Sequence, residues 1–222
     1  MKAFFDEDTQ KDFINPDGAL YVPGAETIKA RLGKLTRYAL SNGIPILGSV
    51  DRHFGTEEWT PYENELQKWG GLFPDHCMDG TDGQKKIDET SIDTIFIENA
   101  APDGLIRTYS QDELEKIIGT GKGVIFEKQG HSVFPEVAGG NAYIDQFLTY
   151  VGVTEVILYG VATDYCVKEA ALGFRRRGID VSVVQDAVKA VDPTTEKAAL
   201  QELEDAGVLF TTTDLVMGGA AP

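Results

Sequence analysis

Cysteine is scarce in this chain of 222 residues, which contains only Cys77 and Cys166. Two cysteines so far apart in the sequence do not form the disulfide framework that stabilises small secreted proteins. We therefore expect a protein of a reducing compartment, and the cytoplasm is the simplest location.

Long apolar runs are also missing. No stretch approaches the roughly 18 apolar residues of a membrane-spanning helix. The first ten residues, MKAFFDEDTQ, lack the apolar centre of a signal peptide. The sequence therefore predicts neither a membrane span nor a signal peptide.

Positive charge is in short supply, with 20 basic residues against 36 acidic ones and a formal net charge of −16. The acidic residues are spread along the chain rather than gathered in a tail. Nucleic acids and anionic membranes both attract positive surfaces. We therefore expect neither of them as a partner.

The chain does contain an alternation of strand-like and helix-like segments. Short apolar runs rich in β-branched residues predict strands at residues 2–5, 44–50, 94–98, 123–127, 153–160, 180–184 and 208–210. Helical spacing predicts helices ending near residue 42, at 112–118 and 141–151, after Cys166, and from residue 192. This order predicts an α/β fold, a doubly wound, mostly parallel sheet with helices on both faces. We expect one domain over residues 1–222, with an insertion at about 78–121.

Cys166 stands where a predicted strand meets a predicted helix, since VTEVILYGV precedes it and CVKEAALGFRRR begins with it. Thr163 or Asp164 is placed to cap that helix. A thiol in the first turn lies near the positive end of the helix dipole, which lowers the thiol pKa. The position suits a nucleophile, and a small buried core thiol is the alternative.

Asp8 and Lys128 each follow or end another predicted strand. Alone, an Asp there is typical of a turn and a Lys is typical of the surface. The carboxyl ends of parallel strands meet at one edge of a sheet, where binding sites lie. Together with Cys166, these residues would supply a proton carrier, a cation and a nucleophile for covalent acyl transfer.

A second cluster consists of Asp51, His53 and His76. Residues i and i+2 of an extended segment point the same way, so Asp51 and His53 can face one ion. One carboxylate and two imidazoles suit Zn²⁺, Fe²⁺ or Mn²⁺. The alternatives are solvated or hydrogen-bonded side chains, and the facial triad of a non-haem iron enzyme. The triad usually reads H-x-D, and it would leave Asp8, Lys128 and Cys166 without a role.

Five motifs in order carry a resemblance to a known family: D-T-Q-K-D-F at 8–13, D-R-H at 51–53, F-P-D-H-C-M-D-G-T at 73–81, K-Q-G-H-S-V-F at 128–134 and G-V-A-T-D-Y-C-V at 160–167. The sequence resembles the isochorismatase-like cysteine hydrolases. The D-x-H followed by P-x-H-C is similar to the nicotinamidase (pyrazinamidase) branch. The family fold is a doubly wound sheet, as the alternation of segments also predicts.

The resemblance implies an amidase that hydrolyses nicotinamide to nicotinate and ammonia through a thioester, in NAD salvage. It implies that Cys166 is the nucleophile, that Asp8 carries its proton, and that Lys128 stabilises the thiolate. The N–H groups of Ala162 and Cys166 would form the oxyanion hole, and the Val161–Ala162 peptide bond would be cis.

The resemblance also implies one divalent metal ion, Zn²⁺ in first place with Fe²⁺ and Mn²⁺ as alternatives, held by Asp51, His53 and His76. The ion would orient the pyridine nitrogen of the substrate. Positions that line the family's substrate pocket correspond to Phe13, Phe73, His131 and Tyr165. Family members are commonly homo-oligomers. Two other functions stay open, a related hydrolase of another small amide, carbamoyl or ureide compound, and a non-catalytic binding paralogue, against which the intact Asp8, Lys128 and Cys166 set argues.

The chain departs from the family pattern in two places. Asp6 and Glu7 stand where the family has apolar strand residues, and they should make it harder to ionise Asp8 and Cys166 unless they point away or pair with a base. A further histidine ligand of some nicotinamidases is missing, and Trp59 lies near its place. The sequence leaves open whether Glu58, Glu63, Glu65 or water replaces it. Cys77, next to His76, is expected to be structural because adjacent extended residues point in opposite directions.

Overall fold

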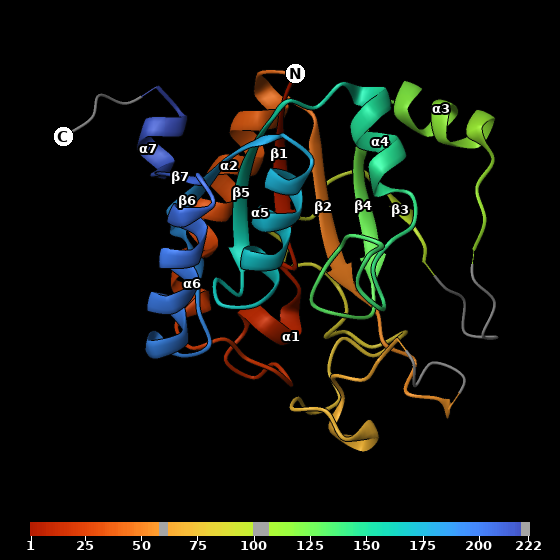
Figure 1. The fold of residues 1–222 in the computed structure, drawn as a ribbon, viewed down its shortest axis with the longest axis vertical. Helices are drawn as coiled ribbons and strands as arrows, with labels where there is room; N and C mark the ends of the chain where they lie inside the picture. Colours follow the sequence, from red (N-terminus) through yellow and green to blue (C-terminus); the bar gives the residue numbers. More distant parts are fainter. Residues whose placement is uncertain (58–61, 100–106, 219–222) are drawn as a thin grey trace.

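A single sheet of seven parallel strands forms the centre of the computed structural model, which describes residues 1–57, 62–99 and 107–218. The strand order is β3-β4-β2-β1-β5-β6-β7, and each neighbouring pair runs parallel (Figure 1). The strands are β1 (Lys2–Glu7), β2 (Ile46–Asp51), β3 (Thr94–Ile97), β4 (Gly123–Lys128), β5 (Glu155–Val161), β6 (Asp180–Lys189) and β7 (Leu209–Thr211).

Helices cover both faces of this sheet, which confirms the predicted fold class. One face carries α1 (Lys11–Ile14), α2 (Lys29–Ser41), α7 (Thr213–Val216) and the 3-10 turn η1 (Ala25–Ile28). The other face carries α3 (Gln111–Gly119), α4 (Ile144–Val151), α5 (Cys166–Arg176) and α6 (Pro193–Asp205). Figure 1 shows α5 and α6 in front of the sheet and α2 behind it. None of the helices in the described ranges is both long and apolar enough to cross a membrane.

The alternation of side chains along β1 builds both halves of the core. Phe5 points toward α5, where its ring meets that of Phe174 with centroids 4.9 Å apart. Phe4 points to the opposite face and packs beside Tyr159 and Tyr38. Both phenylalanines are fully buried, and each such side chain stabilises the fold by roughly 1.5–3 kcal/mol. Burial on both faces is typical of a central parallel strand.

Some element boundaries differ from the sequence-based expectation. The sixth strand runs to Lys189 instead of ending at residue 184, because a register shift after Leu158 lets it continue beside Val161. The fourth helix begins at Ile144, three residues late, because the Asn141 side chain donates to the carbonyl oxygens of Ile97 and Glu127 instead. The segment at about 78–121 supplies β3, the edge strand beside β4, and α3.

The expected capping of α5 by Thr163 or Asp164 is wrong. Tyr165 is the N-cap residue, and it makes no side-chain capping bond. The Asp164 carboxylate instead accepts hydrogen bonds from the N–H groups of Val191 and Asp192 and from the hydroxyl of Thr195. Asp164 therefore ties the loop before α6 to the start of α5, at the carboxyl edge of the sheet.

Candidate active site

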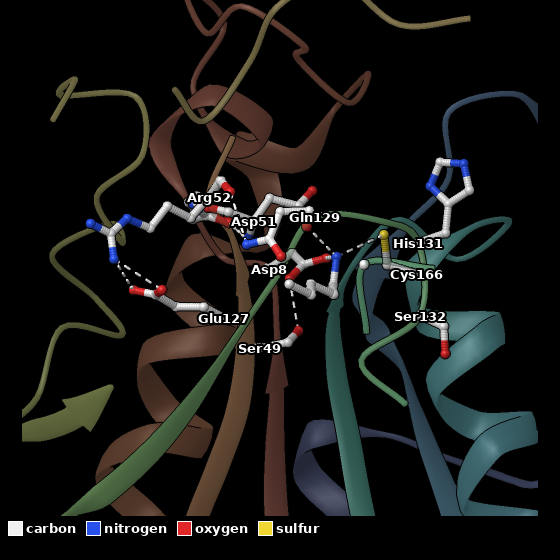
Figure 2. A network of polar contacts seen from close by, with 12 residues as sticks. Asp8, Ser49, Asp51, Arg52, Glu127, Gln129, His131, Ser132 and Cys166 are labelled. Carbon is white, nitrogen blue, oxygen red and sulfur yellow. Dashed lines mark hydrogen bonds and ion pairs between the residues drawn. The ribbon is translucent and has the colours of Figure 1, made fainter. Parts of the chain in front are cut away.

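Asp8, Lys128 and Cys166 meet at the carboxyl edge of the sheet. Lys128 Nζ lies 2.8 Å from Asp8 Oδ2 and 3.6 Å from Cys166 Sγ. Asp8 and Lys128 are fully buried, and Cys166 is 7% exposed. Figure 2 shows Asp8 and Cys166 within one network of polar contacts. The three residues predicted to act together therefore lie within contact distance.

The parallel register explains this convergence. Strands β1, β2 and β4 are neighbours, so residues that end them reach the same edge. Asp8 directly follows β1 with a left-handed backbone (φ 49°), which Asp tolerates better than most residues. Its Oδ1 accepts a hydrogen bond of 2.7 Å from the hydroxyl of Ser49 (Figure 2). Sequence reasoning missed Ser49, although pairing β1 with β2 places it opposite Glu7.

Burial sets the ionisation of this group. It raises the pKa of Cys166 well above the ordinary thiol value, and the attraction of Lys128 does not offset it. This contradicts the expected lowering by the helix start. Burial also raises the pKa of Asp8, against the opposing effect of Lys128. For Lys128, burial favours the neutral form, but Asp51 and Asp8 outweigh it and hold its pKa well above the usual value. Burial therefore favours the thiol form of Cys166, which lies close to the Asp8 side chain.

The residues of the predicted oxyanion hole, Ala162 and Cys166, stand just after the end of β5 and at the start of α5. The Val161–Ala162 peptide bond is cis. Ala162 and Cys166 both line the cavity described below. Cys166 is the first residue of α5, so its N–H has no acceptor within the helix. Just before Ala162, β5 lies very close to β1. A Cβ on Gly160 would lie 1.9 Å from the Glu7 carbonyl oxygen, so this approach requires glycine.

Four buried side chains form the second cluster: Asp51, His53, Glu65 and His76. Each offers one oxygen or nitrogen atom, and these four atoms all lie within 4.8 Å of one another. His76 Nε2 is 3.7 Å from Asp51 Oδ2 and 3.6 Å from Glu65 Oε1. His53 Nε2 is 3.1 Å from Glu65 Oε1. The three predicted metal ligands thus lie together. Glu65, one of the three glutamates considered as a fourth ligand, lies with them.

The donor set fits a divalent metal ion. His76 Nδ1 lies 2.7 Å from the carbonyl oxygen of Pro74, which accepts its hydrogen, so Nε2 is the ring nitrogen that faces the cluster. Burial would lower the pKa of His76, but hydrogen bonds with Asp51 and Glu65 outweigh it and raise that pKa to about 10. The cluster therefore favours positive charge at its centre. Two imidazoles and two carboxylates suit Zn²⁺, Fe²⁺ or Mn²⁺.

Geometry separates the candidate fourth ligands. Glu65 faces both histidines from inside the cluster. Glu63 turns to the other side of His53, 3.7 Å from Nδ1, and accepts hydrogen bonds from the N–H groups of Phe54 and Gly55. Glu58 and Trp59 lie outside the described residues.

Gln10, in the D-T-Q motif, fixes the position of Asp51. Its side-chain amide donates to the Asp51 carbonyl oxygen and accepts from the Asp51 N–H, both at 2.7 Å. Asp12 of the same motif accepts from the Cys77 N–H at 2.7 Å and so anchors the segment that carries His76. The motif thus supplies two positioning residues, Gln10 and Asp12, in addition to Asp8. The sequence analysis assigned no role to these two.

Residues of both clusters line one cavity, Cys166 from the first and Asp51, Glu65 and His76 from the second. The four predicted pocket residues all line it, and aromatic contacts connect them: the Phe73 ring meets those of His131 and Tyr165 at 5.5 and 5.3 Å, and Phe13 lies 5.4 Å from His76. The His131 imidazole contacts Glu65 Oε2 at 2.8 Å. Apolar residues that the sequence analysis did not assign to the pocket complete the lining, namely Leu20, Val22, Val161 and Val191. The lining thus combines apolar and aromatic side chains with the thiol of Cys166 and the polar groups of Asp51, Glu65 and His76.

The structure separates the two unusual acidic residues of β1. Asp6 points away from the catalytic group and pairs with Lys86 at 2.8 Å and with the Thr9 hydroxyl. Glu7 lies at the catalytic group, fully buried. Cys77 is also fully buried and belongs to the apolar cluster under α2, as expected of a structural residue.

Comparisons with known proteins agree with this geometry. Residues 3–214 match the family model described as the isochorismatase domain. The nicotinamidase of Escherichia coli strain K12 is 26% identical and aligns over 93% of each chain. The nicotinamidase/pyrazinamidase of Mycobacterium tuberculosis is 25% identical over 94% of this chain and 97% of its own. The structure of Pyrococcus horikoshii pyrazinamidase in complex with zinc superposes with a TM-score of 0.70 at 25% identity, covering 95% and 98% of the two chains.

Proposed function

The chain belongs to the isochorismatase family, whose relatives named nicotinamidase hydrolyse an amide C–N bond, and on this premise we propose that it is a metal-containing nicotinamidase. One observation carries the proposal: Cys166 and the Asp51, Glu65 and His76 donors border the same aromatic-lined cavity. A ligand in that cavity can meet a nucleophile at one end and a metal ion at the other. Nicotinamide has a carboxamide and a ring nitrogen suited to those ends.

The first half of the reaction forms a thioester. Asp8 accepts the proton of Cys166, and Sγ attacks the carboxamide carbon. The N–H groups of Ala162 and Cys166 stabilise the negative charge on the tetrahedral oxygen. Asp8 then gives its proton to the nitrogen as the C–N bond breaks, and ammonia leaves. Lys128 remains charged throughout and balances the negative charge that passes between Cys166 and Asp8.

The second half regenerates the enzyme. Asp8, ionised again, takes a proton from a water molecule whose oxygen attacks the thioester carbon. The same two N–H groups hold the second oxyanion. When the C–S bond breaks, the thiolate of Cys166 recovers the proton from Asp8, and the acid leaves as nicotinate after giving its remaining proton to solvent. One carboxylate thus serves both steps, as its position beside Sγ requires.

The metal-donor cluster would orient the substrate from the side of the cavity away from Cys166. Asp51, His53, Glu65 and His76 would hold the divalent ion, which supplies a Lewis-acid contact for the pyridine nitrogen. Phe13 and Phe73 are placed to flank the ring, and His131 and Tyr165 to close the pocket. The zinc complex of the Pyrococcus horikoshii relative supports zinc as the ion. This activity would belong to NAD salvage in the cytoplasm.

A comparison of two amides tests the substrate assignment. Benzamide has the shape of nicotinamide but no ring nitrogen. We expect kcat/KM for benzamide to be lower by about 10- to 100-fold, the cost of leaving one buried polar partner unmatched. Equal values for the two amides would show that the ring nitrogen is not recognised and would point to another small amide as the substrate.

A further inference from the structure

Glu7 is a buried acidic residue to which the proposed reaction gives no role. It ends β1, paired in register with Ser49 on one side and Gly160 on the other. Its side chain has no exposure to solvent. One of its carboxylate oxygens, an oxygen of Asp8 and Cys166 Sγ all lie within 4.8 Å of one another. Both carboxylate oxygens of Glu7 are buried without a hydrogen-bond partner among the described residues. Glu7 therefore lies near both atoms between which the proton is proposed to move, but is bonded to neither.

The backbone explains how two consecutive acidic residues reach the same place. Successive side chains of a strand point to opposite faces, as those of Asp6 and Glu7 do. The left-handed conformation of Asp8 interrupts this alternation directly after the strand. Its carboxylate can therefore lie beside that of Glu7.

The charges in this part of the molecule argue for a neutral Glu7. The groups that face it are Asp8 on its own strand, Asp51 from β2, Lys128 from β4 and Cys166 from α5. Apart from the divalent ion proposed at Asp51, Lys128 supplies the one positive charge among these groups. Lys128 forms ion pairs with Asp8 and Asp51, whereas Glu7 has no ion-pair partner within the described ranges.

An unpaired buried carboxylate is costly, so the carboxyl without a cation keeps its proton. Burial and the nearby Asp8 act in the same direction and raise the pKa of Glu7 well above the ordinary value. A protonated carboxyl differs from the apolar residue that the family resemblance implies at this position, because it can donate a hydrogen bond.

We propose that Glu7 is a positioning residue, a neutral carboxylic acid that donates a hydrogen bond to Asp8 and so favours the ionised form that accepts the Cys166 proton. Hydrogen bonding to a charged carboxylate stabilises that form. Ser49 already donates to one Asp8 oxygen, and Lys128 contacts the other. Glu7 would be a third donor, and its proton stays on Glu7 during turnover. The inference rests on the proposed roles of Asp8 and Cys166, and it does not depend on the substrate.

Two variants separate this role from the alternatives. Glu7→Met keeps the length of the side chain but removes the donor, whereas Glu7→Gln keeps an N–H donor without a titratable group. The readout is the rate of Cys166 alkylation by iodoacetamide between pH 5 and 10, followed by peptide mass mapping that distinguishes Cys166 from Cys77. The protein is used with its metal content unchanged and without any substrate.

Removing the donor should make Asp8 harder to ionise. We therefore expect the acid limb of the profile, where the alkylation rate rises with pH, to move to higher pH by about one unit in Glu7→Met. At a fixed pH on this limb, the alkylation rate of Glu7→Met should then be about 10-fold below that of the wild type. Glu7→Gln should keep the limb at the wild-type position.

A shift of both variants to lower pH would mean that Glu7 is ionised, because each variant then removes a negative charge, and this would overturn the proposal. A loss of stability in Glu7→Met with an unmoved limb would assign Glu7 a packing role and would also overturn it. If Glu7→Met does not fold, the Glu7→Gln profile decides alone: overlap with wild type supports a neutral donor, and a shift to lower pH contradicts it. Because alkylation needs no amide, failure to hydrolyse nicotinamide would leave the result intact.

Discussion

The ammonium group of Lys128 lies 2.8 Å from Oδ2 of Asp8, and both side chains are completely buried. The same ammonium contacts Asp51, the first of the candidate metal ligands, and Cys166. One cation thus links the proton-transfer pair to the metal-donor cluster. A charge so placed favours the ionised form of both buried carboxylates, although burial still raises the pKa of Asp8.

Replacing Lys128 should therefore damage both the fold and the reaction. In Lys128→Met, Asp8 and Asp51 lose their shared partner, and breaking a buried ion pair from one side costs about 3–5 kcal/mol of unfolding free energy. Amidase activity should fall below detection. Lys122→Met is a matched control, since Lys122 pairs with Asp93 on the surface and its loss should change stability by less than about 1 kcal/mol. Urea denaturation of both variants measures the difference, and equal effects would contradict the central role of Lys128.

The two cysteines should behave differently when replaced. Cys166→Ala removes the proposed nucleophile from the cavity, so activity should disappear while the fold remains. Cys77→Ala alters a fully buried residue that lies in the core cluster under α2. It should cost stability but spare kcat. Steady-state kinetics with thermal unfolding checks both variants, and an equal loss of kcat in the two would disprove the assignment of the nucleophile.

Glu65 and Glu63 should differ in their effect on metal content. Glu65 faces His53 Nε2 and His76 Nε2, so Glu65→Gln weakens one of four ligands directly. Of the two histidines, Glu63 contacts His53 alone in the described part of the chain, and on the side away from Glu65. Glu63→Gln should therefore lower metal affinity by no more than the roughly 10- to 100-fold typical of an outer partner. Competition with a zinc indicator dye gives both affinities. Tighter retention in Glu65→Gln than in Glu63→Gln would exclude Glu65 as the fourth ligand.

Glu127 should make stability depend on pH. Burial raises the pKa of Glu127 to about 7, although Arg52 opposes the shift. An unfolded Glu titrates near 4.5. Because the pKa of Glu127 is higher in the folded protein than in the unfolded chain, its contribution to the unfolding free energy is complete below pH 4.5. This contribution is lost as the pH rises through 7. The unfolding free energy of wild type relative to Glu127→Gln should therefore fall between pH 5 and pH 8. Denaturation curves at several pH values test this, and a rise over that interval would contradict it.

The sequence predicted those parts of the fold that depend on the local spacing of apolar residues. Alternating strand and helix patterns predict the parallel sheet and place Asp8, Lys128 and Cys166 at the same edge. The end of β6 was not predictable, because it depends on a register shift against β5 that no local pattern contains. The cap of α5 was missed for a similar reason, since Asp164 is used by the distant residues Val191 and Asp192.

Burial explains what the sequence could not supply at the site. Proximity to a helix start predicts a lower pKa for Cys166, but the desolvation of that thiol is a property of the packed molecule and has the opposite sign. The choice between Glu63 and Glu65 depends on which side of His53 each one reaches, and spacing carries no information on that. Asp6 and Glu7 look alike in the sequence, yet only Asp6 finds a base, Lys86.

Ammonia release from nicotinamide tests the central claim most directly. The assay compares the metal-loaded wild type, Cys166→Ala, and wild type stripped by a chelator and then given Zn²⁺ again. We predict release by the wild type, none by Cys166→Ala, loss on chelation and recovery with zinc. Ammonia release by Cys166→Ala at the wild-type rate, or no release by metal-loaded wild type whose Cys166 alkylates readily, would contradict a metal-containing cysteine nicotinamidase.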